Sequence, residues 1–129
     1  MLGEIGKVRS TVTGREELKK IFTKTRVITS EVPADKNFYF YTALGKPTGI
    51  HSASIFEFSD QLNTVEAQSI QFHMSRGDFS KWLSDVIRDG WLAHEFDALR
   101  DRQLPNSKLR DKLTELSARR CSELSNSLK

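Results

Sequence analysis

The strongest periodic pattern in the chain lies between Gly77 and Gly90. Apolar side chains recur there at positions i, i+3, i+4, i+7 and i+8, namely Phe79, Trp82, Leu83, Val86 and Ile87. This spacing places them on one face of an α-helix, and so apolar a face must be covered by other elements. Gly77 suits the left-handed residue that ends a preceding helix, and Asp78 suits the N-cap of the next one. We therefore expect a helical core built around residues 79–87.

Two further helices are expected after this core helix. Asp89-Gly90 interrupts the pattern, and a helix with the apolar residues Trp91, Leu92, Phe96 and Leu99 then stops before Pro105. A last helix begins at Asn106 or Ser107, and its apolar stripe consists of Leu109, Leu113, Leu116, Leu124 and Leu128, interrupted by Arg120. Such a narrow stripe either docks on the core of its own domain or pairs with a second copy of the chain.

A β-hairpin is expected earlier in the chain. Residues 38–42, Phe-Tyr-Phe-Tyr-Thr, are aromatic and β-branched, which favours a strand. Residues 45–49, Gly-Lys-Pro-Thr-Gly, are typical of a turn, and a short strand through Ile50 and His51 would return the chain. Because a lone hairpin is only marginally stable, it should pack against the helices.

The first segment of the chain contains one expected helix and one ambiguous stretch. Thr13 and Glu16 have the spacing of a capping box, and Leu18, Ile21 and Phe22 follow on one helical face. Residues 26–32 are rich in β-branched side chains and could form a short strand, and residues 33–37 are typical of a loop or linker.

Two short helices are expected between the hairpin and the core helix. Ser52 or Ser54 can cap the first, with Glu57 completing a capping box, and Thr64 can cap the second. Residues 69–74 also alternate between apolar and polar side chains, as a strand would. We favour a helix there, because strong helix formers precede them.

These elements predict an α+β fold that is mainly α: a compact helical domain with a small N-terminal β-hairpin and a long C-terminal helix. The length of 129 residues suits one core. We divide the chain into an N-terminal segment with helix, strand and linker (residues 1–36), a helical core with the hairpin (37–104) and the amphipathic last helix (105–129).

Cysteine content and hydropathy indicate a location. Cys121 is the single cysteine, so no intramolecular disulfide can form, which suits a reducing compartment. The N-terminus lacks the apolar run of a signal peptide, and no stretch is long and apolar enough to span a membrane. We expect a cytoplasmic protein that does not contact a membrane.

Residues with catalytic or metal-binding chemistry are scattered along the chain. His51, His73 and His94 have no metal-ligand spacing, and Cys121 has no motif of a reactive thiol around it. We therefore expect no metal, no cofactor and no catalytic residue.

The clearest polar candidates for a site lie around Gly77. Its backbone freedom could bring His73 and Asp78 together, with Trp82 one helical turn further on. One interpretation is a ligand pocket formed by His73, Arg76, Asp78 and Trp82. The other is a structural histidine whose ring forms a hydrogen bond with a helix cap.

The charge distribution allows a second candidate surface. The formal net charge is +3, and basic residues outnumber acidic ones near both ends of the chain. Lys108, Lys112 and Arg119 share a face of the last helix and could contact nucleic acid. Glu115 lies four residues before Arg119, however, and the two could instead form an ion pair within the helix.

The most specific stretch of the chain runs from Phe72-His73 through Arg76-Gly77-Asp78-Phe79 to Trp82. Together with Phe38-Tyr39-Phe40-Tyr41, Gly45 to Gly49, Glu57-Phe58, Leu62, Ser69, Ile87, Asp89 and Leu92-Ala93, it resembles an uncharacterised prokaryotic family of unknown function. The resemblance covers residues 38–99 and leaves out the first 36 residues and the last helix. It implies a fold but no established activity. Members look like stand-alone domains or modules attached to other proteins, some near carbohydrate metabolism, which favours an accessory or regulatory role.

The leading hypothesis is a non-enzymatic interaction or regulatory domain that forms a homo-oligomer, most simply a homodimer through the last helix, and that binds an unknown protein partner. Nucleic-acid binding through the basic terminal segments and small-molecule binding at the His73 cluster are the alternatives.

Overall fold

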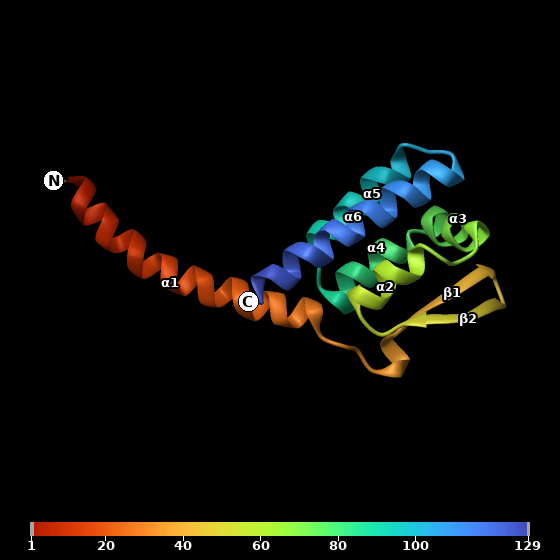
Figure 1. Ribbon diagram of the computed structural model, residues 1–129, viewed down its shortest axis with the longest axis horizontal. Coiled ribbons are helices and arrows are strands. Elements are labelled where there is room, and N and C mark those ends of the chain that lie inside the picture. The colour runs from red at the N-terminus through yellow and green to blue at the C-terminus, as the bar shows by residue number, and fades with distance from the viewer. Residues whose placement is uncertain (1, 129) are drawn as a thin grey trace.

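The computed structural model describes the backbone of residues 2–128 and the side chains of residues 16–128. Its elements are α1 (Leu2–Thr29), the 3-10 turn η1 (Ala34–Lys36), β1 (Phe38–Ala43), β2 (Lys46–Ser52), α2 (Ile55–Leu62), α3 (Ala67–Arg76), α4 (Asp78–Trp82), the π-helical turn η2 (Leu83–Ile87), α5 (Gly90–Asp101) and α6 (Asn106–Ser127). The hairpin lies at one end of the helices, and α1 extends away from them (Figure 1). This confirms the mainly helical α+β fold with its small hairpin and long C-terminal helix.

The hairpin is tighter than the sequence suggested. Strands β1 and β2 pair antiparallel with Phe38 opposite Ser52. The turn consists of Leu44 and Gly45, and Gly45 has a φ of +73°. The expected turn over residues 45–49 was wrong, because Lys46 already begins β2. Proline has no backbone N–H to donate to a neighbouring strand. Pro47 is tolerated in β2 because β2 is an edge strand of this two-stranded sheet, and its outer edge pairs with no further strand.

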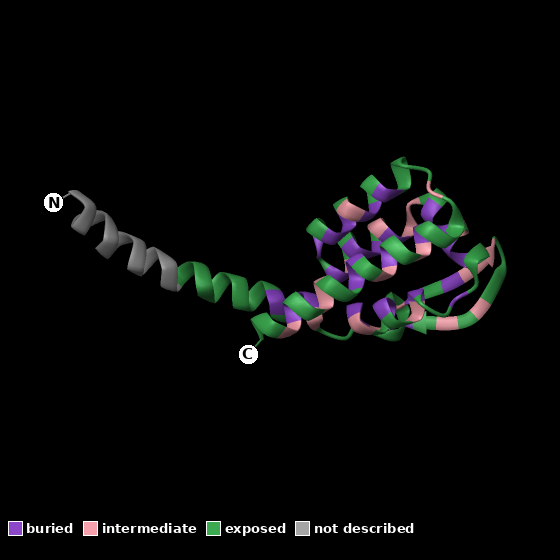
Figure 2. Cartoon of the chain, turned by 45° about the horizontal axis from the view of Figure 1, so that its top comes forward, coloured by how far each residue is buried: buried purple, intermediate pink, exposed green. Residues whose placement is uncertain are grey.

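Helix α1 replaces both the helix start expected at Thr13 and the strand considered for residues 26–32. The helix already begins at Leu2 and continues to Thr29. Thr25 and Ile28 are buried against the body, and the Thr25 hydroxyl donates to the Ile21 carbonyl at 2.8 Å. Burial of these β-branched side chains and internal bonding of the hydroxyl outweigh their preference for a strand. The α1 residues before Thr25 whose side chains are described are exposed (Figure 2).

The caps of α2 and α3 were predicted with mixed success. Ser54 caps α2 and accepts from the Glu57 amide at 3.2 Å, while the Glu57 carboxylate accepts from the Ala53 amide at 2.7 Å. Residues 69–74 lie within α3, which confirms the helix favoured there. Thr64 does not cap α3: its hydroxyl donates to the Gln61 carbonyl at the end of α2, and Glu66 holds the N-cap position.

The apolar stripe of residues 79–87 forms the core, as predicted, although its helix changes form midway. Helix α4 passes into η2, which ends where Arg88 takes a left-handed φ of +74°. Phe79 contacts Phe38 and Phe58 at centroid separations of 5.1 and 5.3 Å. An aromatic cluster therefore joins the hairpin to the helices.

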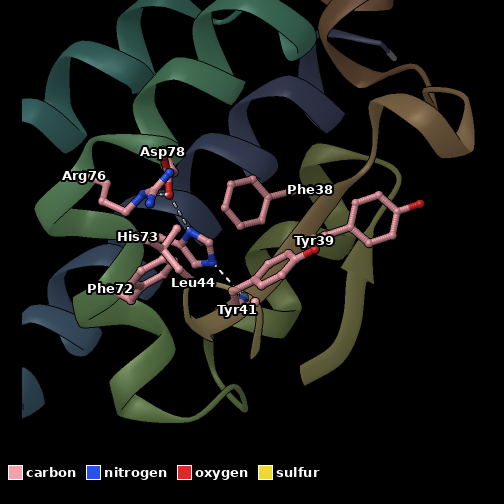
Figure 3. Close-up of a pocket in the computed structure, with 9 residues that line it drawn as sticks. Phe38, Tyr39, Tyr41, Leu44, Phe72, His73, Arg76 and Asp78 are labelled. Atoms are coloured by element: carbon pink, nitrogen blue, oxygen red, sulfur yellow. Dashed lines mark hydrogen bonds and ion pairs between the residues drawn. The ribbon is translucent and has the colours of Figure 1, made fainter. Parts of the chain in front are cut away.

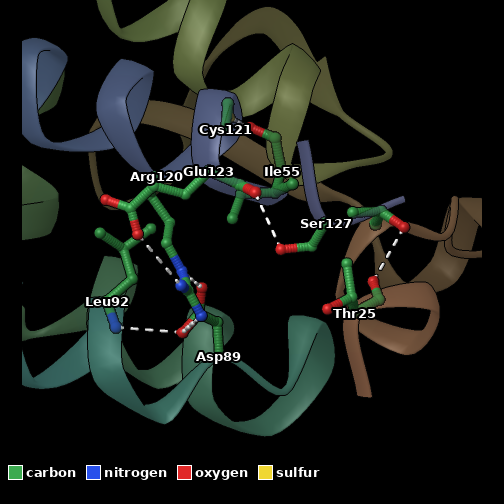
Figure 4. Close-up of polar contacts among 9 residues, drawn as sticks. Thr25, Ile55, Asp89, Leu92, Arg120, Cys121, Glu123 and Ser127 are labelled. Atoms are coloured by element: carbon green, nitrogen blue, oxygen red, sulfur yellow. Dashed lines mark hydrogen bonds and ion pairs between the residues drawn. The ribbon is translucent and has the colours of Figure 1, made fainter. Parts of the chain in front are cut away.

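Helix α6 docks on the core of its own chain, which decides between the two options left open for it. Leu109, Leu113, Leu116 and Leu124 are buried, and α6 packs against α2, α3 and α5. The interruption at Arg120 also has a reason. The Arg120 guanidinium forms two hydrogen bonds, at 2.7 and 3.2 Å, with the carboxylate of Asp89, which is 1% exposed (Figure 4). Asp89 in turn caps α5 by accepting from the Leu92 amide.

Candidate functional site

His73 lies on the inner face of α3, against β1. Its Nε2 accepts from the Tyr41 backbone amide at 2.8 Å, and its Nδ1 lies 2.8 Å from Oδ2 of Asp78. Since a backbone N–H can only donate, Nε2 carries no proton and Nδ1–H donates to the carboxylate. Both ring nitrogens of His73 are therefore already engaged inside the protein.

The surroundings of His73 favour its neutral form. The imidazole is 4% exposed, and burial lowers its pKa below the ordinary value of 6.5, while the hydrogen bond to Asp78 and the Asp78 charge oppose that shift and Arg76 adds to it. A buried, neutral imidazole with two internal hydrogen bonds is the structural histidine considered from the sequence.

Gly77 brings Asp78 back toward α3. Its φ of +76° confirms the left-handed helix end predicted there, and a Cβ at this position would lie 2.9 Å from the Arg100 side chain. Asp78 is not the N-cap of α4, as we expected, but its first residue, and Gly77 holds the cap position. The reason is that the carboxylate accepts from His73 and, at 3.0 Å, from Nε of Arg76.

The structure brings His73, Arg76 and Asp78 together and separates Trp82 from them. The Trp82 indole is 7% exposed, and its Nε1 donates to the Lys36 carbonyl at 2.8 Å. Its ring packs on Phe38 and Phe58 with centroids 5.6 and 5.2 Å away. Trp82 belongs to the aromatic core and does not line the pocket beside His73.

A pocket of about 300 Å³ opens between β1, the hairpin turn and α3 (Figure 3). It is lined by Phe38, Tyr39, Tyr41, Leu44, Gly45, Phe72, His73, Arg76 and Asp78. Sequence reasoning missed the other lining residues, namely Phe38, Tyr39, Tyr41, Leu44, Gly45 and Phe72. The alternation in β1 contains a signal for the two tyrosines, because Phe38 and Phe40 point inward and place Tyr39 and Tyr41 on the opposite face. Leu44, in the turn, has no comparable signal.

The basic residues of α6 form a mixed surface. Lys108, Lys112 and Arg119 are exposed, but Glu95 and Glu115 lie beside Lys112 and Arg119 in a shallow hollow. Among the side chains that the structure describes, Glu115 and Arg119 form no ion pair within 4.0 Å, so the expected pairing was wrong.

Two other cations of α6 have structural contacts. Arg110 donates to the carbonyl of Leu62, the last residue of α2, and to that of Val65 just after it, and Arg120 forms an ion pair with Asp89. These contacts remove both guanidinium groups from any surface patch.

Cys121 is partly buried beside α2. Its thiol donates to the Ile55 carbonyl at 3.7 Å, and burial raises its pKa to about 11. The thiol is thus protonated near neutral pH, when it is a poor nucleophile.

The described residues offer neither a metal cluster nor a membrane-spanning helix. Among the side chains of residues 16–128, no three His, Cys, Asp or Glu groups converge as a metal site would require. Within the same described range, no helix combines the length and apolar character needed to cross a bilayer.

Comparison with known proteins places the chain in a family. The model of DUF5752, a family of unknown function, matches residues 6–118. The chain belongs to this family. The match extends beyond the resemblance seen over residues 38–99 and includes most of α1 and the first half of α6, both of which had been left outside it. No curated protein and no solved structure matches the chain. The division into segments 1–36, 37–104 and 105–129 stays a prediction.

Proposed function

We propose that the protein is a non-enzymatic interaction domain that self-associates through the outer part of α1. The engaged ring nitrogens of His73 and the protonated thiol of Cys121 support a role without catalysis. A general base needs a ring nitrogen within reach of a substrate proton, and His73 has neither of its two available.

The main support for this proposal is a stripe of apolar side chains on α1 that continues beyond the part of the helix packed against the other helices. Thr25 and Ile28, at its inner end, are buried. Leu18, Ile21 and Phe22 continue the same helical face and are 67%, 53% and 42% exposed. Large apolar side chains grouped in this way mark interaction surfaces more often than isolated ones do.

The charges beside the stripe favour a second copy of the chain as the partner. Glu17 and Lys24 lie on the same flank of the stripe, Glu17 at its outer end and Lys24 near its inner end. Two copies of α1 that cross antiparallel midway between these residues would bring Glu17 of each helix to Lys24 of the other. A two-fold interface makes every such contact twice. A parallel pair would oppose like charges instead.

This surface replaces α6 in the expected homodimer. The leucines of α6 that suggested pairing are covered by α2, α3 and α5 of the same chain. A dimer through that stripe would require α6 to leave its own core. The exposed face of α1 requires no such rearrangement.

Light scattering on the full chain, over a range of concentrations, tests self-association. We expect twice the monomer mass for the wild type and the monomer mass for Leu18→Glu. Burying Leu18 in both copies contributes about 2–4 kcal/mol, so its loss weakens the dimer by at least about thirtyfold.

Val27→Glu is the matched control for Leu18→Glu. Val27 is 52% exposed and lies nine residues from Leu18, or two and a half turns, on the opposite side of α1. Its substitution should leave the dimer intact. A monomeric wild type, or equal loss of mass in both variants, would contradict the proposal.

Charge reversal tests the choice of partner. The variants Glu17→Lys and Lys24→Glu should each dimerise more weakly alone than the wild type does, and should dimerise when mixed. Failure of the mixture to dimerise would refute the charge pairing.

A further inference from the structure

The pocket between β1 and α3 has apolar walls and a charged rim. Leu44, 75% exposed at the hairpin turn, lines it together with Phe72 from α3 and with Phe38 and Tyr41 from β1 (Figure 3). At about 300 Å³ it lies at the small end of ligand pockets, so it suits a compact molecule.

The rim carries one cation and one anion with unused atoms. The Arg76 side chain is 46% exposed and the Asp78 side chain 27%. Among the described side chains, the bonds to these residues engage only Nε of Arg76 and only Oδ2 of Asp78. The two Nη groups of Arg76 and the Oδ1 atom of Asp78 are thus left as donors and acceptor at the mouth.

Both rim groups are held in place before any ligand arrives. His73 and Arg76 share Oδ2 of Asp78, and the Arg76 guanidinium lies over the Phe72 ring, 4.9 Å from its centroid. The Tyr41 amide fixes the other side of His73. Such preorganisation reduces the entropy lost on binding.

We propose that this pocket binds an apolar α-amino acid as its zwitterion. The side chain enters between Leu44 and Phe72, the carboxylate accepts from the Nη groups of Arg76, and the ammonium group donates to Oδ1 of Asp78. A ligand with only one charge would leave either Arg76 or Asp78 without an opposite charge. A ligand without an apolar side chain would leave the apolar walls of the pocket exposed to water. The proposal does not depend on self-association.

Calorimetric or NMR titration of the full chain with L-phenylalanine and L-leucine tests the ligand class. 3-Phenylpropionate lacks the ammonium group, phenethylamine lacks the carboxylate, and glycine lacks the side chain. Each of these three should bind at least about tenfold more weakly than L-phenylalanine, because a charge-assisted hydrogen bond or the apolar contact is lost. Equal binding of phenylalanine and either singly charged analogue would overturn the zwitterion assignment. Absence of phenylalanine and leucine binding at about 10 mM would overturn the site itself.

The variant Arg76→Gln tests whether binding occurs in this pocket. It leaves Asp78 in place, and with it the hydrogen bond between Asp78 and His73. It should weaken L-phenylalanine binding at least about tenfold. Lys81→Gln, an exposed cation on α4 that does not line the pocket, is the matched control and should leave binding unchanged. Unchanged binding in Arg76→Gln, or equal losses in both variants, would refute the assignment. Repeating the titration on Leu18→Glu separates this result from that of self-association, since the pocket and α1 share no residue.

Discussion

Replacing His73 with phenylalanine tests whether the imidazole is a structural group. Phenylalanine retains a flat ring against Phe38 and Phe79, whose centroids lie 4.8 and 5.3 Å from the imidazole, so the substitution leaves no large cavity. What it removes are the two hydrogen bonds of the ring, one to the Tyr41 amide and one to Asp78.

The free-energy change follows from the fate of those two partners. The Tyr41 amide is left partly buried without an acceptor, which costs about 1–3 kcal/mol. Asp78 keeps Arg76 and contact with solvent, so its loss is about 1 kcal/mol. We expect His73→Phe to lower the free energy of unfolding by about 2–4 kcal/mol, a large part of the 5–15 kcal/mol typical of a domain.

Urea unfolding at pH 7, followed by circular dichroism, measures this change. His94→Phe is the control, because His94 is exposed on α5, and its effect should stay within about 0.5 kcal/mol. Hydrogen exchange of the Tyr41 amide should also become faster in His73→Phe. A loss of stability no larger than that of the control, with the Tyr41 amide still protected, would refute the structural role of the ring.

The remaining predictions concern pH, the buried ion pair and the thiol. Because burial lowers the pKa of His73, the unfolded chain takes up a proton at a higher pH than the folded chain does. The contribution of the neutral ring to stability is therefore complete above about pH 6.5 and is lost as the pH falls toward the lowered pKa. Below pH 6.5, urea midpoints of the wild type should fall more steeply than those of His73→Phe. Arg120→Ala leaves the Asp89 carboxylate buried without its cation and should lower the free energy of unfolding by about 3–5 kcal/mol in the same assay, whereas a loss under 1 kcal/mol would match a surface pair and contradict this reading. Cys121, whose pKa is raised to about 11, should react with iodoacetamide at pH 8 far more slowly in the native chain than in urea, and equal rates would show that the thiol is neither buried nor protonated.

The sequence predicted elements where local chemistry and packing favour the same structure. The left-handed residue at Gly77, the cap at Ser54 and the apolar stripe from Phe79 to Ile87 were all expected and found. In each case a short-range pattern is enough, because a cap depends on neighbours three residues away and a stripe repeats every turn.

Predictions failed where the local structure depends on a contact with residues distant in the sequence. Of the strand considered at residues 26–32, residues 26–29 are helical because Thr25 and Ile28 pack on the body, and residues 30–32 lie beyond the end of α1. Arg120 interrupts the leucine stripe because its guanidinium donates to the carboxylate of Asp89, which lies 31 residues earlier. A periodic pattern identifies the buried face of a helix but not the side chain opposite it.

The candidate site shows the same division. His73, Arg76 and Asp78 were brought together by their spacing around Gly77, as expected, but Trp82 was assigned to the pocket on helical spacing alone. The second partner of His73 is a backbone amide, which any residue except proline would supply at position 41. Since nothing in the side-chain pattern reports such a bond, the histidine's structural role could be proposed from the sequence but not distinguished from ligand binding.

We interpret the polar groups around His73 as contacts that hold the hairpin to the helices. An NMR titration of the chain labelled with ¹⁵N in its histidine rings tests this interpretation. At pH 7 we expect His73 to be neutral with its proton on Nδ1, and we expect its pKa to lie below 6.5. A His73 ring that is protonated on Nε2 or still charged at pH 7 would contradict it.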